Sequence, residues 1–301
     1  MNHKYLFVVG IGRSGTSLIQ SILHSHSSIH FSPETHFIKR YLSKVGTAYL
    51  ELRLLKKIER DKELNSVSSK IPQYLKEARK LDDEANKVRL IFERLLSEGT
   101  GKEIYLGDKD PMNVNYLGII KKNFPDSKVL HIIRDPRDVI LSRIKTKWGM
   151  KHGMAYHCAE YLHGIIKSRG DGELLFNSNY KEIKYEDILN HAEITVREVC
   201  KFLDLPFETS MLNYEKGSKD LLRENEGDWK SNISRPLMKE NTQKWKKEFN
   251  DKEIEKLEFV FRHHLQALGY SSDASSRSHS SLIFNASVQF YLFLFSVRFG
   301  K

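Results

Sequence analysis

The chain has 301 residues, 40% hydrophobic and 29% charged, a composition that is globular and excludes a disordered or fibrous protein. Its two cysteines exclude a disulfide scaffold, and no Cys/His cluster has the spacing of a zinc site. Forty-nine Lys and Arg against 39 Asp and Glu give a net charge of +10. This surplus predicts an acidic partner: nucleic acid, an anionic membrane or a phosphate-bearing small molecule.

The first predicted elements are a strand, a glycine loop and a helix. Residues 5–9 form a continuous β-favouring run, which is typical of a strand buried on both faces. A turn rich in Gly and Ser follows at residues 10–17, and a helix is expected over residues 18–24. This order of elements is the opening of an α/β domain.

The glycine loop has features of an anion-binding site. Glycines let the backbone approach an anion closely, and the helix N-terminus after them presents free N–H groups. Gly10 and Gly15 are separated by four residues, as in a P-loop, but Thr16 stands where the P-loop has its lysine. That lysine normally reaches the β- and γ-phosphates of a triphosphate. Its absence, with Arg13 inside the loop, argues against an ordinary ATPase.

The rest of the chain continues as alternating helices and strands, without an internal repeat. The further predicted elements are two or three charged amphipathic helices within residues 48–96, a buried strand over 128–133, a helix over 139–147, a strand over 177–184, and helices over 194–203 and 251–268. Gly269 ends the last of these helices, and residues 271–281 form a Ser-rich linker.

The C-terminal tail is apolar, since residues 282–297 carry no charge and are rich in Phe. This run falls short of the roughly 20 apolar residues that a membrane-spanning helix needs. Two interpretations stay open. The tail is either a helix packed on the domain or a helix that lies on a membrane, with Arg298 and Lys301 near the headgroups.

A second strand–helix unit places Arg134 at a strand end and Ser142 eight residues later. An arginine offers a planar fork to a phosphate dianion, and the serine adds a hydroxyl from the first turns of the helix. Together with the loop, this unit resembles the sulfotransferases that use 3′-phosphoadenosine 5′-phosphosulfate (PAPS). The resemblance extends over residues 4–270 and is nearest to the branch of tyrosylprotein and carbohydrate sulfotransferases.

The resemblance implies PAPS as co-substrate and no metal. In this family the glycine loop holds the 5′-phosphosulfate and the second unit holds the 3′-phosphate. The residues that the resemblance assigns to the co-substrate are Gly12, Arg13, Ser14, Gly15, Thr16, Ser17, Arg134, Ser142, Tyr185, Ser231 and Lys244. The last two belong to residues 231–245, which are similar to the family's nucleotide lid, and the exact lid residues stay open. Trp245 in this segment is equally interpretable as a core anchor.

The resemblance also implies three catalytic residues. Glu34 lies 21 residues after Arg13, where the family has the general base that takes the proton of the acceptor hydroxyl. His36 and His30 are rival bases, because histidine is the commonest catalytic base. Lys109, in a turn that resembles the family's Lys-Asp-Pro, is expected to neutralise charge on the bridging oxygen of PAPS. Arg13 is expected to share this role on the non-bridging oxygens.

These observations predict an α/β fold with a P-loop-like parallel sheet of four or five strands, flanked by helices and with helical insertions. The expected domain spans residues 1–270, with the acceptor-side insertion at about 45–105, the linker at 271–281 and an apolar helix at 282–301. The expected enzyme moves a sulfuryl group from PAPS to an acceptor hydroxyl. A carbohydrate is the first expected acceptor, and a tyrosine or phenol is the second.

Two other function classes remain as alternatives. A P-loop kinase acting on a small molecule would need ATP and Mg²⁺, and a non-enzymatic polyanion-binding module would bind nucleic acid or glycan with strong salt dependence. Residues 1–44 carry a net charge of +4 and residues 108–152 carry +5, so the surplus lies around the predicted nucleotide site. This distribution favours a nucleotide over nucleic acid. The expected location is the cytoplasm, at most peripheral to the inner membrane.

Overall fold

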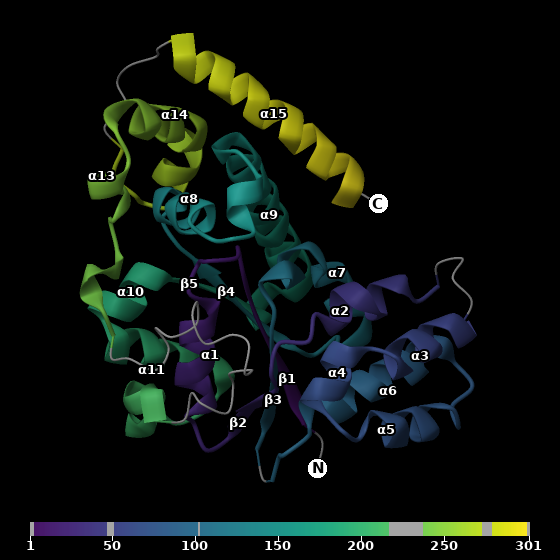
Figure 1. The fold of residues 1–301 in the computed structure, drawn as a ribbon. Helices are drawn as coiled ribbons and strands as arrows, with labels where there is room; N and C mark the ends of the chain where they lie inside the picture. The colour runs from purple at the N-terminus through teal and green to yellow at the C-terminus, as the bar shows by residue number, and fades with distance from the viewer. Residues whose placement is uncertain (1–2, 47–50, 102, 217–236, 273–278, 300–301) are drawn as a thin grey trace.

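A computed structural model describes residues 3–46, 51–101, 103–216, 237–272 and 279–299 (Figure 1). Its centre is a five-stranded sheet in the order β2-β3-β1-β4-β5, and all neighbouring strands are parallel. The strands are β1 (Lys4–Gly10), β2 (Ile29–Phe31), β3 (Tyr105–Lys109), β4 (Lys128–Ile133) and β5 (Tyr180–Lys184). The predicted α/β fold with a parallel sheet is therefore confirmed, with five strands.

Helices cover both faces of the sheet. The α-helices outside the insertion are α1 (Thr16–His24), α2 (Phe37–Arg40), α7 (Leu117–Asn123), α8 (Pro136–Ile144), α9 (Met154–Phe176), α10 (Tyr185–Asn190), α11 (Ala192–Leu203), α13 (Trp245–Glu248), α14 (Asp251–Ala267) and α15 (His279–Phe299). Short 3₁₀ helices are η1 (Leu42–Lys44), η2 (Pro111–Asn115), η3 (Gly149–Lys151), η4 (Asn177–Asn179), η5 (Thr209–Lys216) and η9 (Lys239–Asn241).

Strand β1 is buried on both faces, as its continuous apolar run predicts. Leu6 and Val8 pack with α1, α10 and α11 in one core, whereas Phe7 and Val9 pack with α7, α8 and α9 in the other. Because side chains alternate along a strand, one short run of residues anchors both layers.

The insertion contains four helices, α3 (Glu51–Glu59), α4 (Lys62–Val67), α5 (Ile71–Ala78) and α6 (Glu84–Leu96), where two or three were predicted. Asp61 starts α4 by accepting hydrogen bonds from the backbone N–H groups of Glu63 and Leu64. Figure 1 shows these helices gathered in one group beside α2. Arg40 and Tyr41, at the end of α2, both contact the Asp61 carboxylate and tie the insertion to the domain.

Strands β2 and β3 and helix α9 were not predicted from the sequence. Strand β2 has three residues, and β3 contains Gly107, whose missing side chain leaves room for the Phe31 ring. Helix α9 contacts β4, β5, α7, α8 and α15, so it is buried on several sides and lacks a single apolar stripe.

Helix α15 starts at His279, within the segment predicted as linker, and lies along α9 and α14 (Figure 1). Val288 and Phe295 are its buried apolar side chains among the described residues. This tail was expected to be too short to span a membrane. By length and composition alone, Ser281–Arg298 is sufficient to cross one.

Candidate active site

The carboxyl ends of the five parallel strands meet at one edge of the sheet, where α/β proteins bind ligands. The glycine loop follows β1, Glu34 follows β2, Lys109 ends β3, Arg134 follows β4 and Tyr185 follows β5. These residues line one cavity of about 640 Å³. The predicted site residues Gly12, Arg13, Gly15, Thr16 and Ser17 line the same cavity.

The glycine loop is held in a tight shape by two left-handed residues. Gly15 has φ 95° directly before α1, and Arg13 has φ 83°. The Tyr185 ring lies against Gly15, because a Cβ there would be 2.3 Å from a ring carbon. Gly15 is therefore required by both its backbone angle and its neighbour. The loop leaves the N-terminus of α1 open to the cavity.

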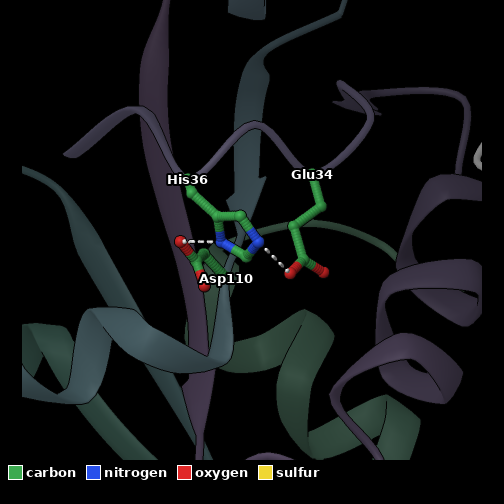
Figure 2. A group of neighbouring side chains, drawn as sticks. All are labelled: Glu34, His36 and Asp110. Atoms are coloured by element: carbon green, nitrogen blue, oxygen red, sulfur yellow. Dashed lines mark hydrogen bonds and ion pairs between the residues drawn. The ribbon is translucent and has the colours of Figure 1, made fainter. Parts of the chain in front are cut away.

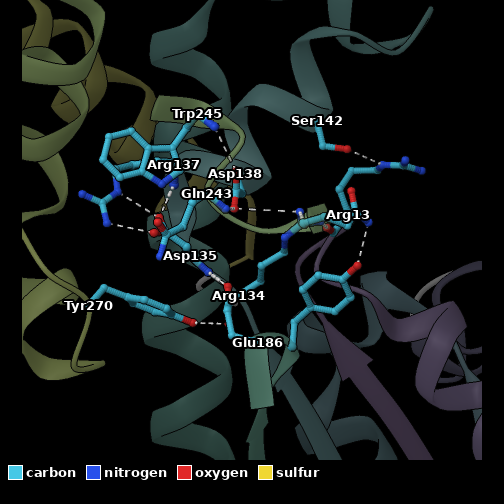
Figure 3. Close-up of polar contacts among 12 residues, drawn as sticks. Arg13, Arg134, Asp135, Arg137, Asp138, Ser142, Glu186, Gln243, Trp245 and Tyr270 are labelled. Atoms are coloured by element: carbon cyan, nitrogen blue, oxygen red, sulfur yellow. Dashed lines mark hydrogen bonds and ion pairs between the residues drawn. The ribbon is translucent and has the colours of Figure 1, made fainter. Parts of the chain in front are cut away.

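Arg13 and Arg134 meet beside this loop (Figure 3). Arg13 Nε donates a 3.0 Å hydrogen bond to Ser142 Oγ, and Arg134 Nη1 donates one of 3.1 Å to the carbonyl oxygen of Arg13. Burial and the nearby Arg134 and Arg143 cations lower the pKa of Arg13. Arg13 and Arg134 belong to the two predicted motifs and are 121 residues apart in the sequence. Their contact joins the motifs into one cationic wall that suits an anion.

Tyr185 and Asn241 complete this wall. The Arg134 guanidinium lies 4.4 Å from the centre of the Tyr185 ring. Arg134 Nη2 donates to the Asn241 carbonyl oxygen at 2.8 Å, and Asn241 Nδ2 donates to the Tyr185 hydroxyl at 2.7 Å. Asn241 was not predicted from the sequence, because its position depends on where the 237–245 segment docks.

Helix α8 anchors that segment. Asp138 accepts from the backbone N–H groups of Gln243 at 2.7 Å and Trp245 at 3.1 Å, and Trp245 stacks with Arg137 (Figure 3). Trp245 is buried, so its interpretation as a core anchor holds. Lys244 is exposed and does not line the cavity, whereas Ser231 lies outside the described residues. The nucleotide role of both stays a prediction.

Glu34 and Lys109 form an ion pair in the cavity. The Lys109 side chain is only 1% exposed and that of Glu34 is 11% exposed. A buried ammonium and a buried carboxylate remain charged at acceptable cost only when they pair. The two predicted catalytic side chains therefore lie together, although 75 residues separate them.

His36 lies beside Glu34 (Figure 2). Its Nδ1 donates a 2.9 Å hydrogen bond to Asp110 Oδ2, and its Nε2 is 3.4 Å from Glu34 Oε1. The hydrogen bond to Asp110 raises the pKa of His36. His30, the other rival base, packs against His24 and does not line the cavity.

Glu34, His36 and Asp110 also offer three ligand atoms within 4.8 Å of one another, a set that could hold a metal ion. Their separation along the chain hides this set from spacing analysis. Lys109 already pairs with Glu34, and His36 already bonds to Asp110. The absence of a metal from the reaction stays a prediction.

Several residues that line the cavity were not predicted from the sequence. Arg143, which is buried, places Nη1 3.5 Å from the Gly12 carbonyl oxygen and pairs through Nη2 with Glu160. The other unpredicted lining residues include Trp148, Tyr156, His163, Phe295 and Arg298. Only Arg143 carried a sequence signal, since it directly follows Ser142 in a predicted helix.

The fold and site define a parallel α/β protein with a P-loop-like anion site that lacks the P-loop lysine. The profile of the sulfotransferase family matches residues 6–209, and the chain belongs to this family. The resemblance inferred from the sequence is thereby confirmed.

Three similar proteins illustrate this membership. Protein-tyrosine sulfotransferase A of Caenorhabditis elegans is 28% identical over 217 residues, 70% of this chain and 53% of that protein. An uncharacterized protein of Aquifex aeolicus is 29% identical over 223 residues, 70% of this chain and 27% of that protein. The chain thus spans about half or less of these relatives' lengths. The sulfotransferase domain of the Synechococcus PCC 7002 olefin synthase shares the fold, with a TM-score of 0.64, 18% identity, and coverage of 90% and 95% of the two chains.

Proposed function

We propose that the protein transfers a sulfuryl group from PAPS to a hydroxyl of an acceptor. The observation that carries this proposal is the joining of Arg13, Ser142 and Arg134 into one wall at the carboxyl ends of β1 and β4. Such a wall suits a ligand with phosphates at both ends of a nucleoside. Family membership supports the same conclusion.

The residues present fit this co-substrate. Ser14 Oγ and Arg134 Nε are buried and have no hydrogen-bond partner among the described residues, as polar atoms that serve a ligand would be. The open N-terminus of α1, with Thr16 and Ser17, would hold the 5′-phosphate. Arg134 and Ser142 would hold the 3′-phosphate, and Tyr185 would contact the nucleotide.

In the proposed reaction, the acceptor oxygen forms a bond to sulfur as the bond from sulfur to the bridging oxygen breaks. The Glu34 carboxylate takes the proton of the acceptor hydroxyl. Lys109 stabilises the charge that develops on the bridging oxygen, and Arg13 does so on the non-bridging oxygens. The products are the sulfated acceptor and adenosine 3′,5′-bisphosphate.

A carbohydrate hydroxyl remains the first proposed acceptor, and a tyrosine or phenol the second. Aromatic Trp148 and Tyr156 beside polar Glu160 and His163 suit the mixed polar and apolar faces of a sugar. The names of the matched relatives support including tyrosine peptides in any acceptor test.

The test is a thermal shift followed by an acceptor assay. Adenosine 3′,5′-bisphosphate should raise the melting temperature more than ATP with or without Mg²⁺, and labelled sulfate should pass from PAPS to one acceptor of a panel. Stabilisation by ATP with Mg²⁺ alone would favour a kinase. Salt-sensitive binding of polyanions without nucleotide binding would favour a polyanion-binding module.

A further inference from the structure

Helix α15 forms part of the wall of the catalytic cavity. Phe295 and Arg298 from this helix line the same cavity as Arg13 and Lys109. The Phe295 ring lies 5.2 Å from the Tyr156 ring, which also lines the cavity and belongs to α9. The C-terminal helix therefore contributes to the same cavity as the nucleotide motifs.

The outward side of the same helix is apolar. The exposed large apolar side chains on α15 are Leu282, Ile283, Phe290, Phe293, Leu294 and Val297. A monomeric soluble protein rarely exposes such a row of large apolar groups unless it contacts a partner or a membrane. Residues 274–301 contain no Asp or Glu, and Arg298 lies near the end of the helix.

A second apolar and basic segment borders the cavity. Exposed Trp148 and Met150 lie within residues 143–152, which contain no Asp or Glu. Three lysines of this segment are exposed, namely Lys147, Lys151 and Lys145, the last of which pairs with Glu248. The His152 ring in this segment stacks on Tyr156 at 4.1 Å, and Tyr156 contacts Phe295. Residues 143–152 and α15 are thus joined through Tyr156, which lines the cavity.

We propose that this surface, made of the outer side of α15 and residues 148–151, rests on an anionic lipid bilayer and that the acceptor hydroxyl belongs to the headgroup of a membrane amphiphile. Large apolar groups with nearby cations and no acids match the boundary between acyl chains and anionic headgroups. Because α15 both meets the bilayer and lines the cavity, a headgroup can reach Glu34 while its chains stay in the lipid. The amphiphile part rests on the proposed sulfuryl transfer.

The first test is flotation of the full chain with vesicles of phosphatidylcholine, alone or mixed with phosphatidylglycerol. We expect binding to the mixed vesicles that weakens with salt, and at least a tenfold loss in the double variant Phe290→Ser/Phe293→Ser. These side chains are 60% and 63% exposed, so the fold should tolerate the change. The matched control is Leu174→Ser/Ile194→Ser, which removes side chains that are 77% and 63% exposed from α9 and α11.

Three results would overturn the membrane surface. The first is no vesicle binding by the unchanged chain, and the second is equal binding by the two double variants. The third is a chain that does not bind vesicles but forms a dimer in solution, which Phe290→Ser/Phe293→Ser disrupts. The third result would show that the outer side of α15 contacts a second copy of the chain. A thermal shift with adenosine 3′,5′-bisphosphate checks that each variant is folded.

The second test detects the acceptor by its partitioning, whatever its headgroup. The full chain and labelled PAPS are added to a lysate of the source cells, and the label is partitioned between chloroform–methanol and water. Label in the organic phase, reduced in Phe290→Ser/Phe293→Ser but not in the control, is expected. Label only in sugars or protein would refute the amphiphile while leaving sulfuryl transfer intact. No labelled product and no binding of adenosine 3′,5′-bisphosphate would refute the proposed function itself.

Discussion

His36 donates a 2.9 Å hydrogen bond from Nδ1 to Oδ2 of Asp110, a buried carboxylate 74 residues further along the chain. This bond fixes the proton on Nδ1 and directs Nε2 toward Glu34. Glu34 thus lies between two basic groups, the Lys109 ammonium and the His36 imidazole. These contacts hold the Glu34 carboxylate in a defined position, unlike that of an exposed loop glutamate.

Replacing the proposed base should separate binding from turnover. In Glu34→Gln, the carboxamide cannot accept the acceptor's proton, so turnover should fall by about 10²–10⁴-fold. Adenosine 3′,5′-bisphosphate should still stabilise the variant, as measured by thermal shift. Full turnover with a good acceptor would show that another group, with His36 first, is the base.

The pH dependence of turnover should report on His36. Its pKa is raised, so the imidazolium persists to a pH above the ordinary value of about 6.5. Below that pKa the imidazolium pairs with Glu34 and makes it a weaker base; above it the pair is lost and turnover should rise. The His36→Gln variant should therefore shift the acidic limb of the kcat profile to lower pH. An unchanged limb would exclude His36 from the titration.

The same linkage has the opposite sign for stability. The ionic contacts of protonated His36 stabilise the fold fully below the unfolded pKa and are lost as pH rises through the raised folded pKa. Urea unfolding should show that the free energy of unfolding of the unchanged chain falls between pH 6 and pH 8. The same fall should be absent from His36→Gln.

The glycine loop should not tolerate a side chain at position 15. Gly15→Ala combines a left-handed φ with a contact of 2.3 Å to Tyr185, so nucleotide binding should be lost. Gly170→Ala in α9 is the control, because a Cβ there meets nothing within 4 Å. This control should bind nucleotide normally and gain about 0.5–1 kcal/mol of stability. Normal nucleotide binding by Gly15→Ala would contradict the described loop.

Two neighbouring arginines should give opposite phenotypes. Arg134→Lys loses the planar fork and should weaken binding of adenosine 3′,5′-bisphosphate by about 10- to 100-fold, with little change in stability. Arg137 does not line the cavity and pairs with Asp135 at 2.8 Å and Glu258 at 2.6 Å in the interior. Arg137→Met should lower the free energy of unfolding by about 3–5 kcal/mol. Calorimetric binding and urea unfolding of both variants measure the contrast.

The parts of the site that the sequence predicts are those carried by short contiguous motifs. The glycine loop and the pair Arg134 and Ser142 each lie at a strand–helix junction, where local periodicity and spacing are informative. The contact between Arg13 and Ser142 follows from β1 and β4 being adjacent in the sheet. Glu34 and Lys109 were found only through the family register.

The missed parts depend on packing between distant segments. Asn241 reaches Arg134 because Asp138 and Arg137 fix the segment around Trp245 against α8. Strands β2 and β3 carry too few apolar residues to show a strand pattern. The place of α15 at the cavity could not be read from its composition, since an apolar helix is compatible with many packing partners.

The left-handed backbone of Arg13 carries a consequence for evolution of the loop. A residue with a Cβ in this region stores about 1–2 kcal/mol of strain, which glycine would relieve. Arg13→Gly should therefore produce a more stable protein that has lost the guanidinium next to Ser142. Selection for stability alone would replace Arg13 by glycine. An arginine at this position is therefore expected only where the protein's function depends on binding an anion.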